Sequence, residues 1–246
     1  MNFVEHAVIF CCAGEQLPGI FALPEVENGD LRERSAFGVA DCGVLIVVGG
    51  PQYRAGSHRQ FLLLSRRLAA RGFPTFRFDY RGMGDASGEA RNFEHVSDDI
   101  AAAIDAFQQQ CPNVRRIVLW GLCDAASASL MYVQAVRDAR VSGLVLLNPW
   151  VRSATSLAQT QIKHYYGQRL LRKEFWWKLL TGRMAVGKAL GDFLRAAVRA
   201  KEGNAVGKKR SLGSFQSRMA LGWRYFSGRV LLILSGDDYT AKEFLG

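Results

Sequence analysis

Histidine is scarce in this sequence, and the cysteines lack the spacing of a metal site or a disulfide framework. Four histidines occur in 246 residues, and no two of them are one helical turn apart. The five cysteines stand at positions 11, 12, 42, 111 and 123, without a CxxC pair. Structural zinc sites need clustered His and Cys ligands, so we expect neither a metal nor a cofactor. An odd number of thiols without such spacing is typical of a reduced, cytoplasmic protein.

The sequence also lacks a membrane-spanning run and a secretory leader. No apolar stretch reaches the roughly 18 residues that a transmembrane helix needs. The opening residues, MNFVEHAVIFCCAG, contain an acid and no basic cluster, unlike a signal peptide. Both features agree with a cytoplasmic location.

Acidic residues are rare in one part of the chain. Residues 151–228 hold 16 Lys and Arg against 3 Asp and Glu, whereas the whole chain has a net charge of +10. Such a basic segment can bind an anionic substrate or touch an anionic membrane surface. Nucleic acid is not expected as a partner, because the basic residues are spread over several amphipathic, helix-like stretches.

Strand-like and helix-like stretches alternate over most of the chain. Two β-like segments open it, at about 2–11 and 16–23. Further apolar runs predict strands within 42–50, 74–82, 115–121, 141–150 and 228–238. Helical patterns separate most of these runs. The alternation predicts an α/β fold, a mostly parallel sheet with helices on both faces.

Residues 151–228 interrupt this alternation with several helix-like stretches. Inserted between two strands, they are expected to form a helical lid over the carboxyl edge of the sheet, where open α/β sheets place their sites. We therefore predict the first part of the core at 1–150, the lid at 151–228 and a last core segment at 229–246. Aromatic residues that could line an apolar pocket, or simply pack between lid helices, are Trp150, Tyr165, Trp176, Trp177 and Trp223.

The stretch RRIVLWGLCDAASASLMY, at 115–132, joins an apolar run to a helix-like run of small residues. Gly121 and Ala125 stand two places before and after Cys123. This spacing is typical of a nucleophile elbow, a strand–turn–helix in which neighbouring backbone comes close. The pattern predicts Cys123 as a nucleophile at a helix N-terminus, where the dipole favours the thiolate. The alternative is a small, buried core cysteine.

The loop after the strand at 42–50, VVGGPQYRAGSHRQF, would then supply part of an oxyanion hole. Pro51 has no N–H, so the donor is Gly50 or Gln52, and the sequence leaves both open. The second donor is the backbone N–H of Asp124, the residue after the nucleophile. The side chain of Asp124 is not expected to act as a general base, because it follows the turn into the helix.

A glycine-rich turn, FRFDYRGMGDASG at 76–88, follows the next predicted strand. Asp79 and Arg81 are expected to pair or to bond to backbone, and Gly82 and Gly84 to supply turn conformations. This loop is therefore interpreted as structural. A nucleotide-binding role is weaker, because there is no GxGxxG motif.

The stretch LLILSGDDYTAKEF, at 231–244, follows the last predicted strand. In a nucleophile–acid–histidine order the acid belongs at this place. Asp238 is predicted to be that acid, with Asp237 in reserve. The alternative is an Asp that caps a helix or shapes a turn.

The motifs GGPQYRAGSHRQF, FDYRGMGD, GLCDAASA and SGDDYTAKEF together resemble those of α/β-hydrolases. More narrowly, they resemble the exosortase A system-associated hydrolases of type 1, which are encoded with exopolysaccharide and protein-sorting genes in Gram-negative bacteria. The resemblance covers about residue 3 to the end. It implies an α/β-hydrolase fold and hydrolysis of an ester or thioester of a small acyl substrate, with Cys123 as nucleophile and Asp238 as acid.

The resemblance also implies a catalytic histidine beyond one more strand. The four histidines, His6, His58, His95 and His164, all precede Asp238. We therefore expect this sequence to lack a final strand and helix together with the general base. The alternative function is an α/β-hydrolase-like protein that binds a ligand or partner without catalysis.

Overall fold

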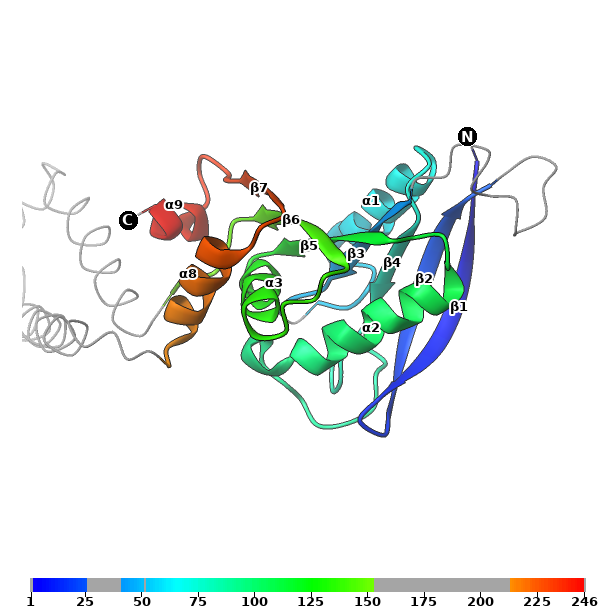
Figure 1. Cartoon of the computed structure of the whole chain (residues 1–246), viewed down its shortest axis with the longest axis horizontal. Helices are drawn as coiled ribbons and strands as arrows, with labels where there is room; N and C mark the ends of the chain where they lie inside the picture. Colours follow the sequence, from blue (N-terminus) through cyan, green and yellow to red (C-terminus); the bar gives the residue numbers. More distant parts are fainter. Residues whose placement is uncertain (1, 26–40, 51, 153–212, 246) are drawn as a thin grey trace, which may run out of the picture. The chain divides into compact units, whose positions relative to one another are not determined.

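The computed structural model describes residues 2–25, 41–50, 52–152 and 213–245. In these ranges, strands form a sheet in the order β1-β2-β4-β3-β5-β6-β7 (Figure 1). The strands β1 and β2 form an antiparallel hairpin, β2 also pairs antiparallel with β4, and the pairs from β4 to β7 are parallel. Their bounds are β1 (Phe3–Cys12), β2 (Glu15–Pro24), β3 (Cys42–Val47), β4 (Thr75–Phe78), β5 (Arg116–Leu122), β6 (Val141–Leu147) and β7 (Arg229–Ile233).

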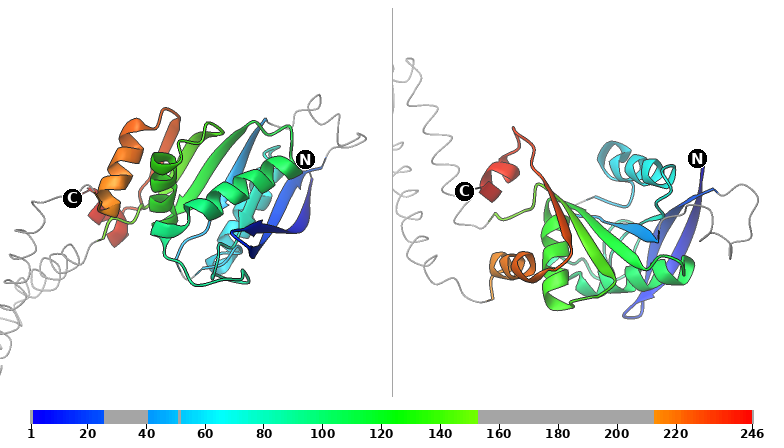
Figure 2. Two further views of the ribbon diagram at one scale, coloured as in Figure 1. Left: turned by 60° about the horizontal axis from the view of Figure 1, so that its bottom comes forward. Right: turned by 45° about the horizontal axis from the view of Figure 1, so that its top comes forward.

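Helices cover both faces of this sheet. The helix α1 (Gln60–Ala69) lies on one face, and α2 (Ser97–Gln110) and α3 (Asp124–Ala135) lie on the other (Figure 2). The remaining described helices are α8 (Phe215–Tyr225), α9 (Tyr239–Leu245) and the short 3₁₀ helices η1 (Ser57–Arg59) and η2 (Phe93–His95). This arrangement confirms the predicted α/β fold.

Burial explains why these segments fold as they do. From Gly43 to Val47, every residue of β3 is buried, as expected of a parallel strand covered on both faces. The buried residues of α1 recur every fourth position, at Phe61, Ser65 and Ala69, which gives the helix one inward face. Phe21 of β2 stacks on Phe76 of β4 with 4.0 Å between ring centroids. The core is thus continuous across the antiparallel and parallel parts of the sheet.

The helix α8 lies with the sheet, although the sequence pattern assigns residues 215–225 to the lid. Residues 1–150 and 215–246 form one compact unit, and 151–214 form another. A Cβ atom added to Gly222 would lie 2.1 Å from the carbonyl oxygen of Leu130, so the missing side chain lets α8 approach α3. Met219, on the same helix, is buried.

The rest of the predicted lid, residues 153–212, lies outside the described residues, as do Tyr165, Trp176, Trp177 and His164. Trp223 is described and is 40% exposed, with its ring 6.3 Å from that of Phe244 in α9. The lid and the pocket beneath it therefore stay predictions. Within the described ranges, no helix is long and apolar enough to cross a membrane.

Candidate active site

Cys123 is the single residue between β5 and α3, as the elbow pattern predicts. Its backbone has φ 59° and ψ −119°, in the region that residues with a side chain rarely adopt. Its side chain is half-buried. The thiol therefore stands at a sharp strand-to-helix turn rather than inside a helix or a strand.

Small residues on either side of Cys123 make this turn possible. A Cβ atom on Gly121 would lie 2.6 Å from the carbonyl carbon and oxygen of Ala125, so no larger residue fits there without a backbone shift. Ala125 is itself buried. The required spacing of small residues, read from the sequence, thus has a direct steric cause.

The end of β6 clamps the same turn. The backbone N–H of Cys123 donates to the carbonyl of Leu147 at 2.8 Å, and the N–H of Trp150 donates to the carbonyl of Cys123 at 3.1 Å. The hydroxyl of Ser127 in α3 donates to the carbonyl of Trp150 at 2.7 Å. Residues 147–150 therefore fix the backbone of the elbow from the side opposite the β3 loop.

The loop after β3 crosses the N-terminus of α3. The N–H of Gly50 donates to Oδ2 of Asp124 at 2.7 Å. A Cβ atom on Gly49 would lie 2.1 Å from Oδ1 of the same carboxyl and 2.8 Å from the nitrogen of Ala125. Of the two predicted oxyanion donors in this loop, Gly50 is thus engaged by a side chain, and this geometry favours Gln52.

The Asp124 carboxyl, at the start of α3, is half-buried. Burial raises the pKa of this carboxyl, and the N–H groups of Gly50 and Ala125 oppose the rise. Burial, followed by the negative charge of Asp124, raises the pKa of Tyr80 to about 12. The charge of Asp124 therefore acts on the hydroxyl of Tyr80.

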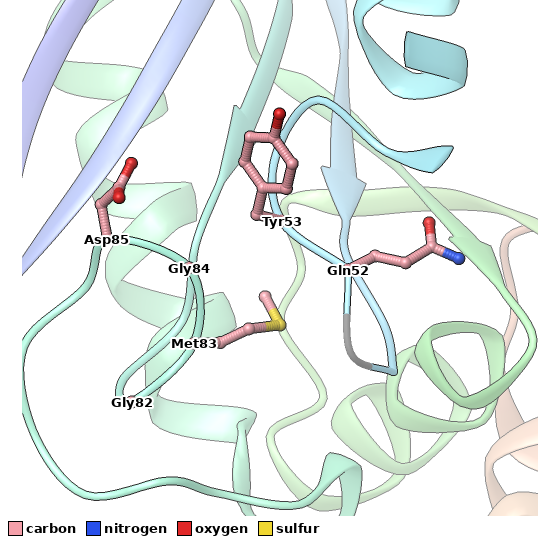
Figure 3. A pocket seen from close by; sticks show the side chains of 6 residues that line it. All are labelled: Gln52, Tyr53, Gly82, Met83, Gly84 and Asp85. Atoms are coloured by element: carbon pink, nitrogen blue, oxygen red, sulfur yellow. The ribbon is translucent and has the colours of Figure 1, made fainter. Parts of the chain in front are cut away.

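A pocket of about 460 Å³ lies between the β3 loop and the loop after β4 (Figure 3). Figure 3 shows Met83 lying between these two loops. The side-chain oxygen of Gln52 accepts from Nε2 of Gln60 at 3.1 Å, which holds that side chain against α1. The pocket is lined by Gln52, Tyr53, Gly82, Met83, Gly84 and Asp85.

Asp79, in the loop after β4, ties the two walls of this pocket together. It is fully buried, accepts the N–H of Arg54 at 2.6 Å and that of Asp85 at 3.1 Å, and forms an ion pair with the Arg54 side chain. A Cβ atom on Gly84, where φ is +58°, would collide with the Asp79 carboxyl. Gly84 therefore allows Asp79 to reach the β3 loop.

Arg81 has a different partner. Its guanidinium donates through Nε and Nη2 to the two oxygens of Asp99, each at 2.8 Å, and both side chains are buried. The hydrogen bond to Asp99 raises the pKa of Arg81 above its ordinary value. Gly82, with φ +71°, lies against the backbone of Glu89. These contacts agree with a structural interpretation of the loop.

Asp238 lies at the start of α9, after β7. Its Oδ1 accepts the N–H of Thr240 at 2.7 Å, so it caps that helix, as the alternative reading holds. Its Oδ2 accepts from the side-chain amide of Asn148 at 3.1 Å. Asp237, the reserve acid, is fully exposed and lies 3.9 Å from Lys242. Of the two acids, only Asp238 is thus tied to the end of a neighbouring strand.

Sequence reasoning missed Asn148, which stands just after β6. It is buried and has φ 45°, a conformation that Asn adopts more readily than most residues. Its amide donates to the Ser235 hydroxyl at 3.0 Å as well as to Asp238, and its Oδ1 accepts the N–H of Ser235 at 2.9 Å. An Asn near the end of the predicted strand segment 141–150 was the available signal. Arg54, which pairs with Asp79, offered none.

The described histidines lie on three separate elements. His6 is in β1, His58 in η1 and His95 in η2, where it pairs with Asn92. No cluster of His, Cys, Asp or Glu that could hold a metal occurs in the described part of the chain. All five cysteines are described and none is in a disulfide. Among the described residues the general base of the predicted reaction thus stays unassigned, and His164 lies outside them.

Comparisons with known proteins agree with this fold. The family described as serine aminopeptidase, S33, matches residues 43–195. No curated protein matches the sequence. Among solved structures, the esterase Pf2001 of Pyrococcus furiosus aligns at 16% identity over 73% of this chain and 64% of its own, with a TM-score of 0.51.

Two further solved structures align with lower TM-scores. The hypothetical protein PA2218 from Pseudomonas aeruginosa has 23% identity over 74% of this chain and 55% of its own, with a TM-score of 0.48. Est1E from Butyrivibrio proteoclasticus, solved with ferulic acid bound, has 18% identity over 63% and 57%, with a TM-score of 0.49. This chain therefore spans between 55% and 64% of the length of these three structures.

Proposed function

Because this chain belongs to the serine aminopeptidase S33 family of α/β-hydrolases, we propose that it hydrolyses an ester or thioester through Cys123. The single observation that carries the proposal is the position of this thiol, alone between β5 and α3 with a backbone φ of 59°. The family description names a serine chemistry, and this chain has a cysteine at the elbow. A thiol at this position can carry out the same acyl transfer as a serine hydroxyl, with sulfur in place of oxygen as the nucleophile.

The proposed reaction has two steps. First the Cys123 thiolate attacks the acyl carbonyl carbon, an S–C bond forms, and the tetrahedral oxyanion collapses with loss of an alcohol or thiol. The proton from the Cys123 thiol goes to the leaving group by way of a base or solvent. Water then attacks the acyl-cysteine, which releases the carboxylic acid and restores the thiol. The N–H groups of Asp124 and Gln52 are the proposed oxyanion donors.

The proposed substrate class is a small acyl compound. The pocket beside the β3 loop includes Gln52, a proposed oxyanion donor, but Cys123 is not among the residues that line it. Its lining combines Tyr53 and Met83 with the glycine backbone of Gly82 and Gly84. The basic residues of 151–228 favour a substrate with a phosphate or carboxylate group. A second proposal for these basic residues is contact with an anionic membrane surface. The resemblance of four motifs to the exosortase A system-associated hydrolases supports a place in exopolysaccharide metabolism.

The test uses p-nitrophenyl acetate and measures release of p-nitrophenolate. We expect an initial phase that is stoichiometric with the protein, followed by slower turnover, since hydrolysis of the acyl-cysteine is a separate step in which help from a general base is worth about 10² to 10⁴ in rate. Cys123→Ala should abolish the initial phase. Cys11→Ala, which removes an exposed thiol in β1, is the matched control and should leave it intact. An initial phase that survives Cys123→Ala would refute the proposed nucleophile.

A further inference from the structure

The carboxylate of Asp124 is wedged between the elbow and the β3 loop. It belongs to the residue directly after Cys123, and it reaches Gly50, which is 74 positions earlier in the chain, through a 2.7 Å hydrogen bond. Gly49 approaches so closely that a Cβ atom there would overlap Oδ1. Two independent features of the loop, a hydrogen bond and a close backbone approach, therefore fix this carboxylate, on the residue next to the proposed nucleophile, against the β3 loop.

This position conflicts with the chemistry proposed for Cys123. Attack on a carbonyl builds negative charge on its oxygen, and backbone N–H groups near the nucleophile are needed to stabilise that charge. The Gly50 N–H already donates to the Asp124 carboxylate, and Pro51 has no N–H to offer. A fixed negative charge nearby also disfavours a second anion, whether a thiolate or an oxyanion.

We propose that the Asp124 carboxylate is a built-in brake on acyl transfer, whose charge opposes the oxyanion formed when Cys123 attacks a carbonyl. The inference rests on the proposed function and adds a residue that sets the rate of its first step. Two electrostatic effects in the structure support it. The N–H groups of Gly50 and Ala125 favour the charged form of Asp124, against burial, which raises its pKa, and the charge of Asp124 contributes, after burial, to the raised pKa of Tyr80.

The decisive variant is Asp124→Asn, because an amide oxygen can still accept the Gly50 N–H while the charge is removed. The first reaction is acetylation by p-nitrophenyl acetate, in which an S–C bond forms at Cys123 and p-nitrophenolate leaves. The second is alkylation by iodoacetamide, in which iodide leaves and no oxyanion forms. The ratio of the two rates separates stabilisation of the oxyanion from ionisation of the thiol.

We expect Asp124→Asn to raise the rate of acetylation about tenfold or more, the order expected for removing a like charge several ångströms away, and to raise alkylation less. Asp41→Asn is the matched control, since it removes the same charge from an exposed residue that pairs with Arg116 at the start of β5. It should leave both rates unchanged. Asp124→Ser serves as a second neutral variant, and thermal unfolding establishes that each variant is folded.

Several outcomes would overturn the brake. If acetylation is unchanged or slower in folded Asp124→Asn and Asp124→Ser, the charge of Asp124 either has no effect on acetylation or assists it. Equal rises in acetylation and alkylation place its effect on the thiol alone. Failure of both neutral variants to fold shows that the charge is needed to hold the loop. If Cys123 is alkylated but never acetylated in any variant, the proposed function itself fails, which is a distinct result.

Discussion

The turn that carries Cys123 and the loop that carries Asp238 both follow strands of the same sheet, but different forces hold them. At the elbow, Gly121 has no side chain and Ala125 has a small one, so that the backbone segments can come into contact. The loop that carries Asp238, here called the acid loop, is held by hydrogen bonds, because the Asn148 side chain makes three of them to Ser235 and Asp238. Steric exclusion is a local property of the sequence, whereas the Asn148 contacts join residues up to 90 positions apart.

The largest expected difference comes from adding one methyl group in each region. Gly121→Ala places a Cβ atom 2.6 Å from the backbone of Ala125, whereas Gly236, in the acid loop, has nothing within 4 Å of an added Cβ. We expect Gly121→Ala to lower the free energy of unfolding by about 3 kcal/mol or more and Gly236→Ala to change it by less than about 0.5 kcal/mol. Urea denaturation measures both. Equal effects would mean that the elbow is not sterically closed.

That steric closure is why the elbow could be predicted from sequence. Gly121, Cys123 and Ala125 lie within five residues, and the small size of Gly121 and Ala125 indicates the turn. The strands and the α/β class were equally accessible, because apolar runs such as that of β3 report burial directly. The bond from Gly50 to Asp124 and the contacts of Asn148 could not be predicted, since a polar side chain does not reveal which distant backbone group it will meet. The place of α8 was missed because its apolar pattern does not distinguish packing on α3 from packing in a lid.

Substitutions of Asn148 test the second region of the comparison, the acid loop. Asn148→Gly keeps the backbone conformation at φ 45° and loses the side-chain hydrogen bonds, at a cost of about 2 kcal/mol. Asn148→Ala adds the strain of a left-handed residue, about 1 kcal/mol more. The two unfolding curves separate these contributions. If Asn148→Ala were as stable as the original protein, the acid loop would not depend on this side chain.

Backbone strain at the elbow gives the next effect. Cys123→Gly and Cys123→Ala both remove the thiol, but only glycine adopts φ 59° without cost. We expect the glycine variant to be more stable than the alanine variant by about 1 kcal/mol. Differential scanning calorimetry of the pair makes the comparison at one residue. An alanine variant of equal or greater stability would argue that the turn is not strained.

The smallest effect separates the two candidate acids. Asp238→Ala removes the cap of α9 and one partner of Asn148, and we expect it to cost about 1 kcal/mol. Asp237→Ala removes an exposed side chain whose Lys242 partner is 3.9 Å away, and no measurable loss of stability is expected. If acetylation of Cys123 also falls in Asp238→Ala and not in Asp237→Ala, the proposed order of the two acids is supported. The reverse result would make Asp237 the acid.

The central claim is that Cys123 forms the acyl intermediate. The most direct measurement mixes the protein with p-nitrophenyl acetate, quenches with acid at successive times, and maps the acetyl group by peptide mass spectrometry. The elbow geometry predicts that the peptide containing Cys123 is acetylated first, ahead of the peptide containing the exposed thiol of Cys11, and that the acetyl group is lost slowly to water. Acetylation of Cys11 before Cys123, or none at Cys123 while p-nitrophenolate is released with turnover, would contradict the claim.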